Sequence, residues 1–218
     1  MNFDISPLII SLKSALTGTS ITFVIGIIIA YWMSKYNGKL KSLIDSILTI
    51  PLVLPPTVLG FLLLMIIGKR GLLGNLLDKI GGSPVFTWRG AAIAAAVVSF
   101  PLMYRTARGA FEQIDIDIIN AARTLGASEW KIFIKIAIPM AWPGIAAGTV
   151  LSLARALGEF GATLMVAGNI PGKTQTIPTA IYFASEGGNM KVAGIWVITI
   201  FVLSLGFILL INYWNGYN

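Results

Sequence analysis

Cysteine and histidine are both absent from the 218 residues, and charged side chains make up only 11% of them. Without these two residue types the chain cannot form a disulfide, a thiol nucleophile, a histidine base or a Cys/His zinc site. A soluble domain is about 25% charged, whereas 56% of this chain is hydrophobic and its mean hydropathy is +0.83. The composition therefore excludes soluble enzymes, soluble binding modules and disordered chains, and indicates one membrane-embedded unit.

Acidic residues are also scarce, with nine Asp and Glu against sixteen Lys and Arg and a formal charge of +7. In a membrane protein such an excess usually marks the cytoplasmic loops. We therefore expect a lipid bilayer, and no nucleic acid, as the partner of this basic chain.

Five apolar runs are long enough to span a membrane, because a bilayer core of about 30 Å needs about 20 apolar residues in a helix. The runs are too long, and lack the strict alternation, for barrel strands. The second run carries Pro51, Pro55 and Pro56, which predicts one bent helix. The five predicted spans cover residues 8–32, 46–68, 88–105, 139 to beyond 154, and 192–214.

The orientation follows from the charges between the spans. The N-terminus carries Asp4 and no basic region, so we expect the first span to be retained rather than cleaved as a signal peptide. Five spans place the termini on opposite sides, and the loops hold eight Lys and Arg on one side against six on the other. By a narrow margin, this predicts an external N-terminus and a cytoplasmic C-terminus.

One long polar stretch, residues 111–138, interrupts the apolar pattern. Its first part predicts a helix with one apolar side, formed by Ile114, Ile118, Ala121, Ala122 and Leu125. Gly126 favours a helix end, and Ser128 favours the start of a second short helix that carries Trp130. The pattern predicts a rigid knob of two short helices, with an amphipathic hairpin lying on lipid headgroups as the alternative.

The same stretch resembles the EAA loop of ABC-importer permeases, whose pattern is Glu-Ala-Ala, three residues, Gly, nine residues, Ile, one residue and Leu-Pro. Every spacing matches, from Asn120-Ala121-Ala122 through Gly126 and Ile136 to Ile138-Pro139. Asn120 replaces the glutamate, which implies a weaker salt bridge to the ATPase, and Ile138 replaces the leucine. The resemblance assigns ATPase coupling to Asn120, Ala121, Ala122, Leu125, Gly126 and Trp130, with the small alanines fitting a groove on the partner.

Two further stretches, residues 155–162 and 169–178, are similar to the permease subunits of molybdate importers. The resemblance implies an all-α membrane protein in the type I ABC importer permease fold, with a single transmembrane domain over residues 8–214. It also implies a homodimeric channel, two cytoplasmic ABC ATPase subunits and an external oxyanion-binding protein. Because the EAA loop of the family is cytoplasmic, the resemblance supports the orientation given by the charges.

Arg155 and Glu159 are four residues apart within the fourth span. At this spacing they share a helix face and can form an ion pair, as charges at membrane depth require. We expect this ion pair to lie beside the translocation path, with Phe160, Gly161 and Thr163 forming the gate. The alternative is an ion pair that serves only to hold two helices together.

Gly168 to Thr174 looks like a P-loop but has three residues, rather than four, between its first glycine and Gly172-Lys173-Thr174. We therefore expect an external turn, no cofactor on this chain, and ATP used by a partner subunit. Gly144 and Gly148 form a GxxxG pattern, for which internal helix packing is favoured over a dimer contact.

The sequence thus predicts a multi-pass transport subunit of the cell membrane, and not an enzyme, within an ATP-driven molybdate importer. A permease for tungstate or sulfate is the nearest alternative. A secondary transporter is less favoured because few ionisable residues lie within the spans, and a membrane enzyme is disfavoured by the missing His and Cys.

Overall fold

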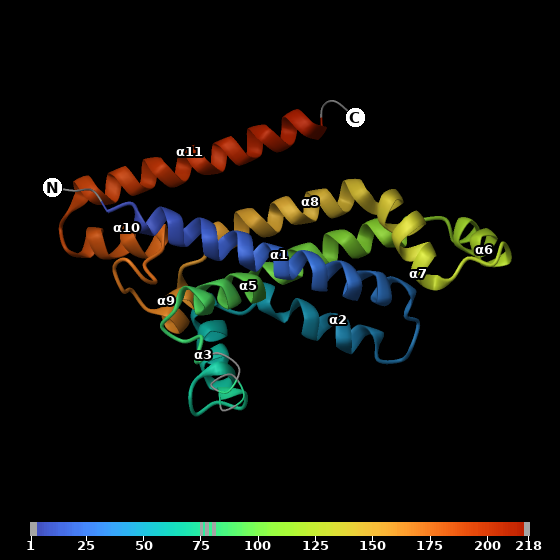
Figure 1. The fold of residues 1–218 in the computed structure, drawn as a ribbon, viewed down its shortest axis with the longest axis horizontal. Helices are drawn as coiled ribbons and strands as arrows, with labels where there is room; N and C mark the ends of the chain where they lie inside the picture. Colours follow the sequence, from blue (N-terminus) through green and yellow to red (C-terminus); the bar gives the residue numbers. More distant parts are fainter. Residues whose placement is uncertain (1–3, 75, 77–78, 80–81, 216–218) are drawn as a thin grey trace.

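A computed structural model describes the chain except for residues 1–3, 75, 77–78, 80–81 and 216–218, and the side chains from residue 210 onward. Its secondary structure consists of helices that run mainly along one long axis (Figure 1). The elements are α1 (Ser6–Lys35), α2 (Lys41–Thr49), η1 (Ile50–Leu52), α3 (Pro56–Ile67), α5 (Trp88–Glu112), α6 (Ile116–Thr124), α7 (Glu129–Ile132), η2 (Phe133–Ala137), α8 (Ile138–Leu157), α9 (Gly161–Ala167), α10 (Ile177–Glu186) and α11 (Met190–Asn215).

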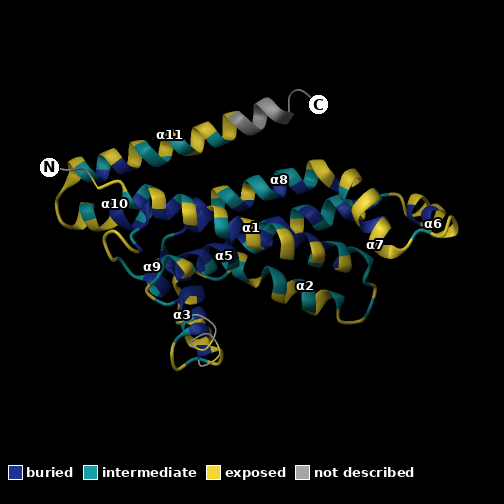
Figure 2. Ribbon diagram, in the orientation of Figure 1, coloured by how far each residue is buried: buried dark blue, intermediate teal, exposed yellow. Residues whose placement is uncertain are grey.

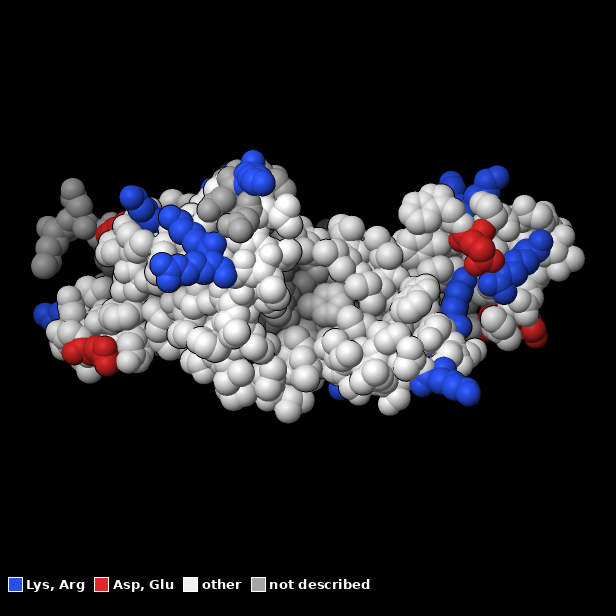
Figure 3. All heavy atoms as spheres, turned by 90° about the horizontal axis from the view of Figure 1, so that it is seen from below, with Lys and Arg blue, Asp and Glu red and all other residues white. Residues whose placement is uncertain are grey.

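Among the residues that the structure describes, four helical segments are long and apolar enough to cross a membrane, and the α2–α3 segment makes up to five. The four are Ser6–Lys35, Trp88–Glu112, Glu129–Leu157 and Met190–Leu209. The predicted first, third and fifth spans are confirmed as helices. On the face shown in Figure 3, Lys and Arg gather at the two ends and leave an uncharged belt between them. This distribution is the one expected of helices that cross a bilayer.

Small residues hold α1, α5 and α8 together. A Cβ on Gly18 would lie 2.9 Å from the Ala92 carbonyl oxygen, and one on Gly144 would lie 2.4 Å from the Ala110 Cβ. A Cβ on Gly148 would also meet α5, 3.2 Å from Met103 Sδ. Both glycines of the GxxxG pattern therefore pack inside the chain, as predicted, and allow the close approach typical of helices in lipid.

The second predicted span is broken rather than bent. The axis turns by 110° between Lys41–Leu52 and Pro56–Ile67, and Pro55 lies at the break in an extended conformation, with φ −55° and ψ 137°. Proline lacks the N–H that a continuing helix needs, and a following proline disfavours helical geometry at the residue before it. Two successive prolines therefore stop the helix, so the bend predicted over 46–68 is a break between two helices.

Helix α8 begins at Ile138 with Pro139 in its first turn, as predicted, but the apolar helical segment that contains α8 begins at Glu129. The second helix of the knob, α7, continues through the π-helical stretch η2 into α8. In η2 the Ile138 N–H donates to the Phe133 carbonyl, five residues back. The knob is therefore attached to the membrane helix without a break. The short helices α9 and α10 between α8 and α11 were not predicted.

Burial falls from the centre of the bundle outward (Figure 2). In the apolar window of α5, 67% of the residues are buried, against 44% in α1 and 11% in α11. A membrane helix can expose apolar side chains to lipid at no cost, so α11 remains compatible with a bilayer.

Candidate functional site

The knob comprises residues 111–138. Local hydrogen bonds define both ends of its first helix, α6. Asp115 caps its start, because its carboxylate accepts from the Asp117 N–H at 2.9 Å. Gly126 ends it with φ +80°, and the next N–H, of Ala127, donates to the Ala122 carbonyl at 3.0 Å. This left-handed turn, which glycine favours, lets the chain reverse into α7 within three residues.

The interior of the knob is a small apolar cluster. Ile119, Ala122 and Ile132 are buried together, and Ile114, Ala127 and Ile136 pack against them. Ala122 is therefore part of the core of the knob itself, whereas Ala121 is exposed. The expectation that both alanines fit a groove on a partner holds at most for Ala121, because Ala122 shares the inward face with Ile119, three residues earlier.

The outer surface of the knob carries large apolar side chains. Leu125 is 88% exposed and Trp130 is 66% exposed, and the Trp130 ring lies 5.5 Å from that of Phe133. Ile116 and Ile118 are exposed as well. Apolar groups gathered on the polar end of a protein are typical of a contact surface for another protein.

A charged network fixes the knob to α1, and it was not predicted from the sequence. Glu129 accepts from Arg123 Nε at 2.6 Å and from Lys35 Nζ at 3.0 Å. Asn120 Oδ1 accepts from Arg123 Nη1 at 3.1 Å, and the bonds to Glu129 raise the pKa of Arg123. Asn120, where the family pattern has glutamate, thus orients an arginine of its own helix. Sequence reasoning missed Lys35 and Glu129, because 94 residues separate them.

A crevice of about 340 Å³ lies where the knob meets the bundle. Its walls come from the end of α1, the end of α5 and the inner side of α6, and they include Lys35, Glu112 and Arg123. Lys35 and Arg123 are both paired with Glu129, and Glu112 is paired with Arg108 at 2.8 Å. The charges in the crevice therefore already have partners within the chain.

The predicted pair of Arg155 and Glu159 forms at the opposite end of α8. Arg155 Nη1 lies 2.9 Å from Glu159 Oε2, and Glu159 Oε1 accepts from the Ala162 N–H at 2.7 Å. The Glu159 side chain is 1% exposed and that of Arg155 is 31% exposed. Since α8 ends at Leu157, Glu159 joins the end of one helix to the first turn of the next.

The remaining gate candidates lie on or beside α9. The Phe160 ring is 5.1 Å from that of Tyr182 on α10. A Cβ on Gly161 would lie 3.0 Å from the Pro56 Cβ, so α9 closely approaches α3. Thr163 is 2% exposed within this packing. The structure thus brings the five residues into one region, with Gly161 and Thr163 in helix contacts inside the chain.

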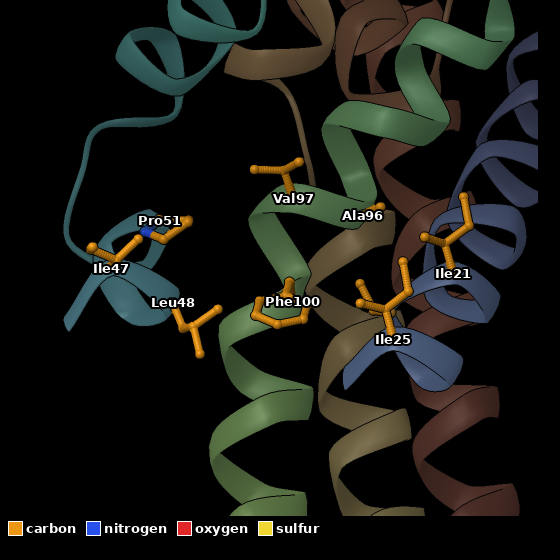
Figure 4. Close-up of a pocket in the computed structure, with 9 residues that line it drawn as sticks. Ile21, Ile25, Ile47, Leu48, Pro51, Ala96, Val97 and Phe100 are labelled. Atoms are coloured by element: carbon orange, nitrogen blue, oxygen red, sulfur yellow. The ribbon is translucent and has the colours of Figure 1, made fainter. Parts of the chain in front are cut away.

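A separate pocket of about 240 Å³ lies between α1, α2, η1 and α5. Ile47, Leu48 and Pro51 line one side, and Phe100 of α5 lies opposite them (Figure 4). Thr22 is the polar residue of its lining, and its hydroxyl already donates to the Thr19 carbonyl at 2.9 Å. This pocket therefore offers no group that would bind an anion. Among the described residues, no group of three Asp or Glu is arranged to hold a metal ion.

Comparison with known proteins agrees with this architecture. Residues 22–213 match the family model described as binding-protein-dependent transport system inner membrane component. ModB of Escherichia coli (strain K12), a molybdenum transport system permease protein, is 45% identical over 209 residues, which are 94% of this chain and 90% of that protein. YvgM of Bacillus subtilis (strain 168), provisionally named as a molybdenum transport system permease, is 49% identical over 200 residues, which are 91% of this chain and 88% of that protein.

Among solved structures, a bacterial ABC transporter involved in the import of the acidic polysaccharide alginate has the same fold. Its TM-score is 0.74 at 19% identity, over 96% of this chain and 79% of that one. The family match, the relatives and the apolar helices together show that this chain belongs to the binding-protein-dependent transport system inner membrane components, as a multi-pass permease subunit of the cytoplasmic membrane.

Proposed function

We propose that this chain is the membrane subunit of an ATP-driven molybdate importer. The observation that carries the proposal is the 45% identity to a molybdenum transport permease over nine-tenths of both chains. The exposed Leu125 and Trp130 on the knob give that subunit a contact surface for a partner. ATP is hydrolysed by that partner, and this chain binds no cofactor.

The working assembly is two copies of this chain, two cytoplasmic ATPase subunits and an external oxyanion-binding protein. A divalent oxyanion faces a steep desolvation cost in hydrocarbon, so it needs a water-lined path. Four or five membrane helices are too few to enclose such a path, whereas two subunits can form it between them. Residues 8–214 form the single transmembrane domain.

The knob lies in the cytoplasm, which places the N-terminus outside and the C-terminus inside. Leu125 and Trp130 insert into the ATPase, while Asn120, Ala121, Ala122 and Gly126 set the shape of α6 and of its turn. The support for this division of roles is burial: the first two side chains are exposed, and Ala122 is buried inside the knob.

The gate lies at the far end of α8, at Arg155, Glu159, Phe160, Gly161 and Thr163. Glu159 would repel a free anion, and its two oxygens already face Arg155 and Ala162. It therefore shapes the gate without binding the substrate. ATP binding closes the ATPase pair, the knobs follow, and the two subunits rock between states open to either side.

Uptake of radioactive molybdate by proteoliposomes holding the permease, its ATPase and its binding protein tests this function. Uptake that requires ATP and survives a protonophore is expected. Uptake that persists without ATP and collapses with a protonophore would instead favour a secondary transporter. Calorimetry of the binding protein with molybdate, tungstate and sulfate identifies the anion, and a preference for sulfate would contradict the molybdate assignment.

A further inference from the structure

Helix α8 and the knob form one continuous lever. The segment Glu129–Leu157 runs without a break from α7 through η2 to the end of α8. In Figure 1 it extends from the knob toward the end of the molecule that holds α9. Any movement imposed on the knob therefore reaches Leu157 directly, but Gly158 ends the helix there. What lies beyond Leu157 decides whether the movement continues.

Glu159 bridges this break. Its Oε1 accepts from the Ala162 N–H at 2.7 Å, a donor in the first turn of α9 that has no partner within its own helix. Its Oε2 lies 2.9 Å from Nη1 of Arg155 on α8. The side chain is 1% exposed, so water cannot replace the bond from the Ala162 N–H, and a buried unpaired group would be costly. The carboxylate thus ties the last turn of α8 to the first turn of α9.

Helix α9 in turn is closely packed against α3. A Cβ on Gly60 of α3 would lie 2.9 Å from the Cα of Ala162. Leu59, Leu63 and Ile67 of α3 share a buried cluster with Ala162 and Val166 of α9. Because packed helices at this density move together rather than deform, α9 and α3 form one unit at the end opposite the knob.

We infer that Glu159 is a positioning residue that transmits the movement of the lever α8 to the α9–α3 unit. This inference rests on the proposed function, because the movement originates in the ATPase. The competing path runs through α5, which also contacts α9. If α5 carries the movement, the Glu159 contacts are structural only.

A matched pair of double variants, both without Arg155, isolates the contact of residue 159 with Ala162 as the step that transmits the movement. Arg155→Met with Glu159→Gln removes both charges but keeps an oxygen that accepts from the Ala162 N–H. Arg155→Met with Glu159→Leu has similar volume and no acceptor. In the complete transporter in proteoliposomes, we expect the Leu variant to hydrolyse about ten times more ATP per molybdate ion transported, the effect of one buried hydrogen bond. Equal ratios in the two variants would overturn the inference.

A distance measurement in a protein that keeps Glu159 tests the inference even if the Glu159 variants fail to fold. The chain has no cysteine, so spin labels can be attached at Leu151→Cys on α8 and Leu164→Cys on α9. We expect the distance between the labels to be the same with and without ATP, while the distance between the Leu151 labels of the two subunits changes. A change between Leu151 and Leu164 would show that α9 does not follow α8 and would refute the inference. Absence of molybdate uptake by the wild type would refute the proposed function alone.

Discussion

Gly126 lies between the two arms of the knob with φ +80°, and no atom outside its immediate surroundings lies within 4 Å of the position of a Cβ. Space is therefore available for a side chain, and only the backbone conformation opposes one. A residue with a Cβ is less stable by about 1–2 kcal/mol in this left-handed region. The glycine thus contributes backbone freedom rather than room for a partner.

Substitution of Gly126 tests this distinction. Gly126→Ala is expected to destabilise the turn by about 1–2 kcal/mol, to reduce the amount of ATPase that co-purifies, and to lower uptake. Gly126→Asn is expected to retain more of both, because asparagine tolerates the left-handed region better. Gly109→Ala, in a helix and with open space around it, is the matched control. Equal losses for Ala and Asn at position 126 would contradict a backbone role.

Leu125 and Trp130 are expected to act through the partner and not through the fold. Because Leu125 is 88% exposed, Leu125→Ser is expected to leave the thermal unfolding of the isolated permease unchanged. A loss of about 2 kcal/mol at an interface anchor would weaken ATPase binding roughly 30-fold. The control is Leu72→Ser, an 86% exposed leucine away from the knob. Undiminished ATPase binding by Leu125→Ser would show that Leu125 does not lie in the interface.

At the scale of elements, the junction between α7 and α8 depends on Pro139. An α-helix would use the N–H of residue 139 to bond the carbonyl of residue 135, and proline has none. The preceding turn is π-helical, with the Ile138 N–H donating to the Phe133 carbonyl. A π-bulge adds one residue to a turn and so shifts the helix face by about 100°. The direction in which the knob points therefore depends on this one proline.

Replacement of this proline is expected to raise stability and lower transport. Pro139→Ala restores a backbone donor, which is worth about 1 kcal/mol, and allows η2 to become α-helical. The knob then turns relative to α8, so molybdate uptake falls while the unfolding temperature rises. Pro143→Ala, inside α8 and away from η2, should raise stability without loss of uptake. Equal uptake by both variants would contradict a role for η2 in aiming the knob.

Single-sequence reasoning succeeded for elements whose pattern is local. The spans within α1, α5 and α11 follow from unbroken apolar runs, and the turn at Gly126 and the cap at Ser128 follow from residue type. The ion pair of Arg155 with Glu159 followed from a spacing of four. In each case the partners are close in the sequence.

Prediction failed where the outcome depended on packing or on competing local effects. Three prolines indicate a bend over 46–68, but neither its angle of 110° nor the packing of α3 against α9 through Gly60 follows from them. Pro139 does lie in the first turn of α8, but its residue type gives no sign that the π-helical stretch η2 joins α8 to α7 without a break. Lys35 could not be joined to Glu129 from the sequence, because only the folded bundle brings the end of α1 to the knob.

At the scale of the whole molecule, the two proposed functional regions lie at opposite ends of one bundle. The knob carries exposed apolar groups, and the region of Glu159 and α9 is tightly packed. Helix α8 connects them, and α1 is tied to the knob through Lys35 and Glu129. Such an arrangement suits a subunit that rocks as a body, because it has few hinges between the proposed ATPase contact and the proposed gate.

The position of the knob relative to the membrane and the ATPase tests the account most directly. Leu125→Cys introduces the only thiol into a chain that has none, on a side chain that is 88% exposed. The account predicts that a membrane-impermeant maleimide does not label it in intact cells, and that a thiol cross-linker joins it to the ATPase subunit in inverted vesicles. Labelling from outside intact cells, or the absence of any cross-link to a nucleotide-hydrolysing protein, would contradict the account.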